Sequence, residues 1–108
     1  MSVTFGNEVS GKAGDTGISR KVLSYNNDIM LVEVSVTAGN QVAVHSHPHK
    51  QISYVAKGSF EVTINDQNYT LTAGDSFMPL PNEPHGAKAL SDGMLIEFFS
   101  PIREDFLQ

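Results

Sequence analysis

Apolar residues recur at every second position in one run after another along this chain. The clearest run places them on one parity, at Met30, Val32, Val34 and Val36. Because successive side chains of a strand point to opposite faces, this alternation indicates a half-buried strand. No segment has a sustained helical period of apolar residues. Many short runs, with turn residues about every 8–12 positions, predict an all-β sandwich or barrel.

Further strands are expected on the same grounds. Their ranges are 18–25, 42–47, 51–57, 60–64, 69–71, 85–90 and 94–99, with an edge strand near 3–5.

In the last long strand, Glu97 and Phe99 share a parity opposite to Phe98. If Phe98 packs in the core, Glu97 and Phe99 face the other side, where a cavity can lie. Phe60, Phe77 and Tyr54 are expected in the core.

Three of the four histidines lie in one stretch between Gly39 and Gly58, at His45, His47 and His49. Side chains two positions apart in a strand point the same way, so His45 and His47 share a face, and Gln51 has the same parity. The fourth, His85, lies in a second stretch rich in glycine and proline. Three imidazoles and one amide oxygen are a ligand set for a divalent transition metal.

Such a set is uncharged, so a bound metal keeps its full charge and acts as a strong Lewis acid. Zinc, nickel, manganese and iron all accept imidazole, and the sequence does not choose among them. The alternative is that these are ordinary surface or core histidines. Pro48 interrupts the strand before His49. His49 is therefore either a further ligand or a group that hydrogen-bonds to a ligand or to the substrate.

Composition excludes several classes of function. The chain has 108 residues, enough for a single domain, and a formal net charge of −5. Its basic residues are scattered, which argues against nucleic acid and anionic membranes as partners. It has no cysteine, so disulfides and thiolate metal sites are excluded. We find no secretory signal pattern and no apolar run of spanning length, so a cytoplasmic protein is expected.

Two motifs resemble those of the cupin superfamily. The spacing Gly39, five residues, His45-x-His47, three residues, Gln51, six residues, Gly58 is similar to the first cupin motif, with Gln51 where glutamate is usual. The segment from Gly74 to His85 resembles the second motif. There the departures are Leu80 for proline, Asn82 for glycine and, further on, Ala89 for asparagine.

The resemblance implies a double-stranded jelly-roll barrel with a metal inside it. Its implied ligands are His45, His47, Gln51 and His85. The single domain, residues 1–108, would then have a core barrel at about 18–100, an N-terminal arm at 1–17 and a C-terminal tail at 101–108. A homodimer is also expected, in which the segment before residue 26 supplies an exchanged edge strand.

A narrower similarity is to small single-domain cupins of the pectin-degradation KdgF type. It is carried by H-S-H-P-H-K-Q, by the segment from Gly74 to His85, and by the ending F-F-S-P-I-R-E-D-F. It implies that 4,5-unsaturated uronates are converted to linear ketonised sugars. Glu97, Phe99 and Arg103 would be the active-site residues, with Glu97 moving a proton and Arg103 orienting the carboxylate of the sugar.

Other interpretations stay open at this point. Glu97 is otherwise an exposed strand residue, and Arg103 a surface residue paired with Glu104 or Asp105. A metal-dependent dioxygenase suits three histidines with open metal positions. A non-enzymatic module that binds sugar or metal is the third alternative. Nucleophilic catalysis has no support, because the chain has neither cysteine nor a G-x-S-x-G motif.

Overall fold

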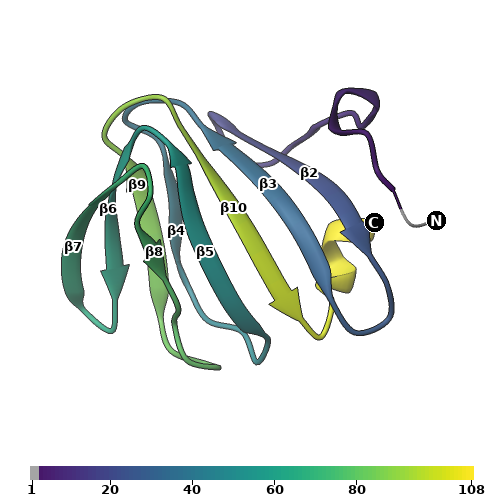
Figure 1. Cartoon of the computed structure of the whole chain (residues 1–108). Coiled ribbons are helices and arrows are strands. Elements are labelled where there is room, and N and C mark those ends of the chain that lie inside the picture. Colours follow the sequence, from purple (N-terminus) through teal and green to yellow (C-terminus); the bar gives the residue numbers. More distant parts are fainter. Residues whose placement is uncertain (1–2) are drawn as a thin grey trace.

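Two antiparallel sheets make up most of the chain (Figure 1). The computed structural model describes residues 3–108, so Met1 and Ser2 of the expected N-terminal arm lie outside the described residues. The strands are β1 (Lys12–Ala13), β2 (Ile18–Tyr25), β3 (Met30–Val36), β4 (Gln41–His45), β5 (Lys50–Lys57), β6 (Ser59–Ile64), β7 (Gln67–Thr72), β8 (Ser76–Phe77), β9 (His85–Ala89) and β10 (Gly93–Ser100). Two short 3-10 helices are η1 (Gly6–Glu8) and η2 (Glu104–Leu107). Within residues 3–108, no helix is long and apolar enough to cross a membrane.

The sheets have different sizes. The larger has the order β1-β2-β3-β10-β5-β8, and the smaller has the order β4-β9-β6-β7. Neighbours such as β3 and β10 are far apart in sequence, as a jelly roll requires. The two sheets pack face to face, because Phe60, Val62 and Ala87 of the smaller sheet share one buried cluster with residues of the larger. The predicted jelly-roll barrel is confirmed.

The alternating strand of the sequence lies at the centre of this core. Met30, Val32, Val34 and Val36 on β3 are all fully buried, as predicted, and Phe60 is buried too. Burying each such side chain contributes about 1.5–3 kcal/mol.

The expected edge strand at 3–5 is wrong, since these residues form no strand. The short strand β8 was not predicted.

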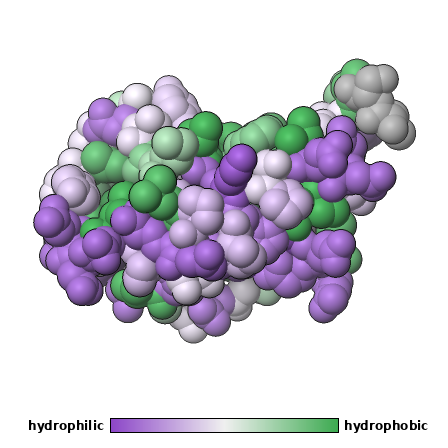
Figure 2. All heavy atoms as spheres, turned by 90° about the horizontal axis from the view of Figure 1, so that it is seen from below, coloured by the Kyte–Doolittle hydropathy of each residue, from purple (hydrophilic) through white to green (hydrophobic). Residues whose placement is uncertain are grey.

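On two strands, β5 and β10, the face that points inward is the one opposite to Tyr54 and Phe98. Tyr54 on β5 is 48% exposed and Phe98 on β10 is 36% exposed, so neither is a core residue. The inward residues are Gln51, Ser53 and Val55 on β5, and Leu95, Glu97 and Phe99 on β10. Because apolar residues such as Phe98 face outward, the surface carries hydrophobic as well as hydrophilic side chains. Seen from below, the hydrophobic ones show as patches between the hydrophilic ones (Figure 2).

Glycines at positive φ close two of the turns. Gly39 has φ 85° and an ideal Cβ there would meet nothing within 4 Å. Gly58 has φ 75°, and a Cβ there would lie 2.5 Å from the backbone oxygen of Asp92. Gly58 therefore serves both the turn and the close approach of a neighbouring chain segment, whereas Gly39 serves the turn alone.

The substitution Gly58→Ala should therefore destabilise the protein much more than Gly39→Ala. Both add a side chain at positive φ, which costs about 1–2 kcal/mol. Only Gly58→Ala also forces the backbone at Asp92 to move, for a total loss above about 3 kcal/mol. Urea unfolding of both variants measures the difference. Equal losses would show that the tight contact at Gly58 carries no energetic weight.

Candidate metal centre and active-site cavity

A cavity of about 230 Å³ opens between the two sheets. Its lining includes most of the residues singled out in the sequence: His45, Gln51, His85, Glu97, Phe99 and Arg103. The strand registers explain why they meet. On the smaller sheet His45 of β4 lies opposite His85 of β9. On the larger sheet Phe99 lies opposite Gln51, and Glu97 lies opposite Ser53.

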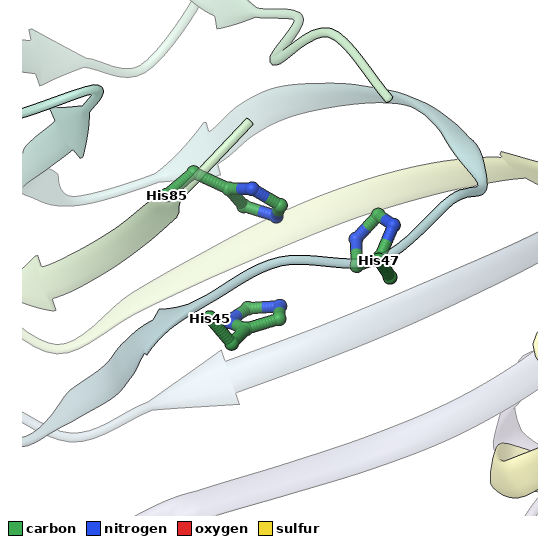
Figure 3. Close-up of side chains that lie close together, drawn as sticks. All are labelled: His45, His47 and His85. Carbon is green, nitrogen blue, oxygen red and sulfur yellow. The ribbon is translucent and has the colours of Figure 1, made fainter. Parts of the chain in front are cut away.

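Three histidines gather at this cavity. One ligand atom from each of His45, His47 and His85 lies within 4.8 Å of those of the other two. The three rings point toward a common space, from β4, from the segment that follows it, and from β9 (Figure 3). His47 stands just beyond β4, which ends two residues before the predicted end of this strand. The cluster predicted from the His-x-His spacing and His85 is thus present in space.

The segment that carries His47 is pinned to the proline-rich loop before β9. The amide of Asn82 donates a 2.7 Å hydrogen bond to the backbone oxygen of His47. Asn82 adopts φ 66°, in the left-handed region that asparagine tolerates better than most residues. This explains how asparagine can stand where the second cupin motif usually has glycine.

Backbone carbonyls fix the orientation of two of the rings. His45 Nδ1 lies 2.8 Å from the oxygen of Ala43, and His85 Nδ1 lies 2.8 Å from the oxygen of Glu83. A carbonyl only accepts, so each neutral ring carries its proton on Nδ1. The lone pair is then on Nε2. This tautomer is the one that a metal-ligating imidazole needs when it binds through Nε2.

Gln51 turns its oxygen toward the histidines because its nitrogen is engaged elsewhere. Gln51 Nε2 donates to Ser53 Oγ at 2.8 Å and to Glu97 Oε2 at 2.9 Å. Ser53 Oγ also donates to Glu97 Oε2, at 2.8 Å. Gln51 Oε1 is therefore left 2.8 Å from His47 Nε2 and 3.1 Å from His85 Nε2.

These groups fit a cation. The His85 lone pair and Gln51 Oε1 are both acceptors, and they face each other at 3.1 Å. Two facing acceptors repel unless a cation or a proton lies between them. His47 also has a buried Nδ1 without a partner. Neutral imidazoles with one amide oxygen suit a divalent transition metal, and the donor set does not choose among zinc, nickel, manganese and iron.

Burial sets the charges of the site. It lowers the pKa of His47 from 6.5 to about 4, and it also lowers the pKa of His85. Both rings are therefore neutral near pH 7 and keep their lone pairs. Burial raises the pKa of Glu97, against the opposing effect of its hydrogen bond from Ser53. A carboxyl group with a raised pKa is suited to exchange a proton near neutral pH.

The C-terminal tail closes one side of the cavity. The Arg103 guanidinium lies over the rings of Phe99 and Phe106, at 5.3 and 4.3 Å. It also pairs with Asp105 at 2.9 Å, which was the structural alternative considered for it. Arg103 thus lines the cavity and, at the same time, forms the ion pair with Asp105. Glu97 is not the exposed strand residue of the alternative interpretation.

His49 lies apart from the three clustered histidines. Its ring centroid is 5.4 Å from that of His47, and its Nδ1 is buried without a partner. It is not among the histidines whose ligand atoms converge. A role beside the ligands, supporting His47 or the substrate, remains a prediction.

Sequence reasoning missed three residues of the site: Ser53, Arg20 and Phe106. Ser53 shares the parity of Gln51, which was the signal available for it. Arg20 lies in the strand predicted at 18–25, where nothing in the pattern marks it as inward, yet it lines the cavity. Phe106 lines the cavity as well, and no pattern in the tail distinguishes it from a terminal surface residue.

The pKa of His47 predicts how the stability of the metal-free protein depends on pH. Unfolded histidine takes up its proton near pH 6.5, but folded His47 does so only near pH 4. The unfolded state thus binds more protons in this window, and the contribution of His47 to stability is lost as pH falls from about 6.5 to 4. His47→Gln should flatten this part of the dependence in EDTA-treated protein, measured by urea unfolding. An unchanged dependence of stability on pH in this variant would contradict the lowered pKa of His47.

Comparison with known proteins agrees with this geometry. Residues 32–100 match the family described as Cupin domain. The pectin degradation protein KdgF of Dickeya dadantii (strain 3937) is 45% identical over 93 residues, which cover 84% of each chain.

Solved structures give the same result over nearly the whole chain. An RmlC-like cupin from Shewanella frigidimarina NCIMB 400 superposes with a TM-score of 0.95 at 39% identity, covering 98% of this chain and 96% of that one. KdgF from Halomonas sp. superposes with a TM-score of 0.94 at 35% identity, covering 98% of both chains. The chain therefore belongs to the cupin family and, within it, to the group of small cupins that includes the KdgF proteins.

Proposed function

We propose that this chain is a metal-dependent enzyme that converts 4,5-unsaturated uronates to linear ketonised sugars. One observation carries the proposal: half-buried Glu97 is hydrogen-bonded to Gln51, whose other end faces the histidine cluster. A group able to exchange protons is thereby held next to a set of metal ligands in one cavity. Relatives named KdgF, one of them a pectin degradation protein, support a uronate as the substrate.

His45, His47, His85 and Gln51 would hold the metal. When bound, the metal supplies Lewis acidity that polarises an oxygen of the sugar. Gln51 adds no charge to the set, and its orientation is fixed by Ser53 and Glu97. The ligands are thus held in place before the substrate arrives, which avoids reorganisation during the reaction.

The reaction is an isomerisation, so its atoms and electrons balance without a co-reactant. The anomeric hydroxyl loses a proton as its oxygen becomes a carbonyl, and the ring C–O bond breaks. The electron pair of that bond stays on the ring oxygen as an enolate, which becomes a ketone when C4 gains a proton. Glu97 takes the first proton and delivers the second, which requires a pKa nearer neutrality than that of an exposed glutamate.

Arg103 and Phe99 position the substrate in this proposal. Asp105 contacts Nε and Nη2 of Arg103, which leaves Nη1 for the carboxylate of the sugar. Phe99 packs beneath the guanidinium and is itself 1% exposed, so it limits where the sugar can lie. The homodimer, the cytoplasmic location and the domain boundaries expected from the sequence stay predictions.

Removing two of the ligands should remove the metal. Elemental analysis of purified wild type should give about one equivalent of a transition metal, and the His45→Ala/His47→Ala double variant should have almost none. The matched control is His49→Ala, which should keep its metal because His49 is outside the cluster. A folded, metal-supplemented wild type without bound metal would eliminate Lewis-acid chemistry.

Removing the carboxylate should stop turnover and leave the metal bound. Glu97→Gln keeps the size of the side chain but cannot transfer a proton, so we expect kcat to fall about 10²–10⁴-fold. The loss of ultraviolet absorbance of an unsaturated uronate measures the rate. Glu33→Gln, on the neighbouring strand β3, should have the wild-type rate.

The same assay separates the proposal from its alternatives. Metal-loaded wild type that leaves the absorbance unchanged relative to the blank would overturn the proposal. Oxygen uptake with an electron-rich substrate would identify a dioxygenase instead. Sugar binding without turnover, unaffected by Glu97→Ala, would identify a binding module.

A further inference from the structure

A second arginine reaches the cavity from β2, which lies in the same sheet as the strand of Glu97 and is separated from it by β3. Arg20 on β2 lies opposite Val34 of β3, which is fully buried in the core. Residues paired across neighbouring strands point to the same face, so the Arg20 side chain is on the inner face of the larger sheet. It lines the cavity together with His45 and Glu97.

Arg20 forms no ion pair with a carboxylate in the part of the chain that the structure describes. Within residues 3–108 the one ion pair is that of Arg103 with Asp105, and Arg20 makes no side-chain hydrogen bond. Its Nε is buried without any partner. Asp15 lines the same cavity but does not pair with Arg20. A buried, unpaired donor on a cation costs free energy, so its retention calls for a ligand.

The surroundings of Arg20 hold the guanidinium in place. It lies over the ring of Phe106, 5.0 Å from the ring centroid, and Arg103 lies 4.3 Å from the same centroid. On another side, a Cβ on Gly14 would come within 2.8 Å of Arg20 Nη1. The absence of a side chain at Gly14 therefore leaves the space that the guanidinium occupies.

Arg20 and Arg103 differ in how far a neighbouring carboxylate neutralises their charge. Asp105 accepts two hydrogen bonds from Arg103 and neutralises much of its charge. Arg20 also acts on Glu97 as its strongest charged neighbour, opposing the effect of burial on the pKa of that carboxyl. Arg20 is thus the cation of this cavity whose charge is available to an incoming anion.

We propose that Arg20 is a specificity-determining residue that binds the carboxylate of the sugar acid, jointly with Arg103. The chemical class of the ligand, a uronate, rests on the proposed function. A guanidinium donates two parallel hydrogen bonds to a carboxylate, which a neutral sugar cannot accept in the same way. Arg20 therefore makes the cavity select a uronate over the corresponding neutral sugar.

Binding of D-galacturonate and of D-galactose to the full chain tests this directly. These sugars differ in the carboxylate and contain no double bond to react, so calorimetric titration reports recognition alone. We expect wild type to prefer galacturonate, and Arg20→Gln to bind it at least about tenfold more weakly with no change for galactose. The matched control is Lys21→Gln, which removes the same charge from the next residue of β2 and should bind as wild type does.

A second variant keeps the test valid if Arg20→Gln does not fold. Gly14→Ala retains Arg20 but displaces its guanidinium, and should also weaken galacturonate binding without affecting galactose. Thermal unfolding confirms that each variant is folded. The proposal is overturned if wild type binds both sugars equally or binds neither. It is also overturned if Arg103→Gln abolishes the preference while Arg20→Gln and Gly14→Ala retain it.

Failure of this inference is distinguishable from failure of the proposed function. If the unsaturated uronate is turned over but Arg20→Gln keeps the preference for galacturonate, only the role of Arg20 is lost. If no turnover occurs but the preference depends on Arg20, the cavity binds uronates and the proposed reaction is lost.

Discussion

Polar side chains interrupt the apolar inner face of the larger sheet, and the whole site depends on them. On β5 the inward side chains pass from Val55 to Ser53 and Gln51, and on β10 Glu97 lies between the apolar residues Leu95 and Phe99. A buried polar group without a partner costs about 1–3 kcal/mol. The β5–β10 register avoids this cost by placing Glu97 opposite Ser53, within reach of Gln51.

This pairing has a consequence for the centre of the cavity. Once Ser53 and Glu97 engage the nitrogen of Gln51, the amide oxygen must face the histidines. Backbone carbonyls orient His45 and His85 in a comparable way. The lone pairs of His45 and His85 therefore converge with the amide oxygen of Gln51, and the hydrogen-bond network prepares a place for a cation. The same interactions that satisfy buried polar groups thus create the candidate metal centre.

Opposite charges are distributed over different parts of the cavity wall. Glu97 lies on β10, whereas the guanidiniums of Arg20 and Arg103 gather around Phe106 of the C-terminal tail. The tail therefore does more than cover the barrel, because its Phe106 contacts both Arg20 of β2 and Phe99 near the end of β10. Low polarity around these groups strengthens their effect on an anionic ligand.

The sequence alone indicated most of the strands and the candidate metal ligands. Alternation identified β3 and its buried residues, and the spacing of His45, His47, Gln51 and His85 indicated a metal centre, because both depend on local periodicity. Only the tertiary structure decided which face of β5 and β10 turns inward. Both faces carry apolar residues, such as Phe98 and Phe99, so hydrophobicity could not distinguish them. It also decided the place of Arg20, because an arginine in a strand is expected outside unless a distant segment, here the tail with Phe106, covers it.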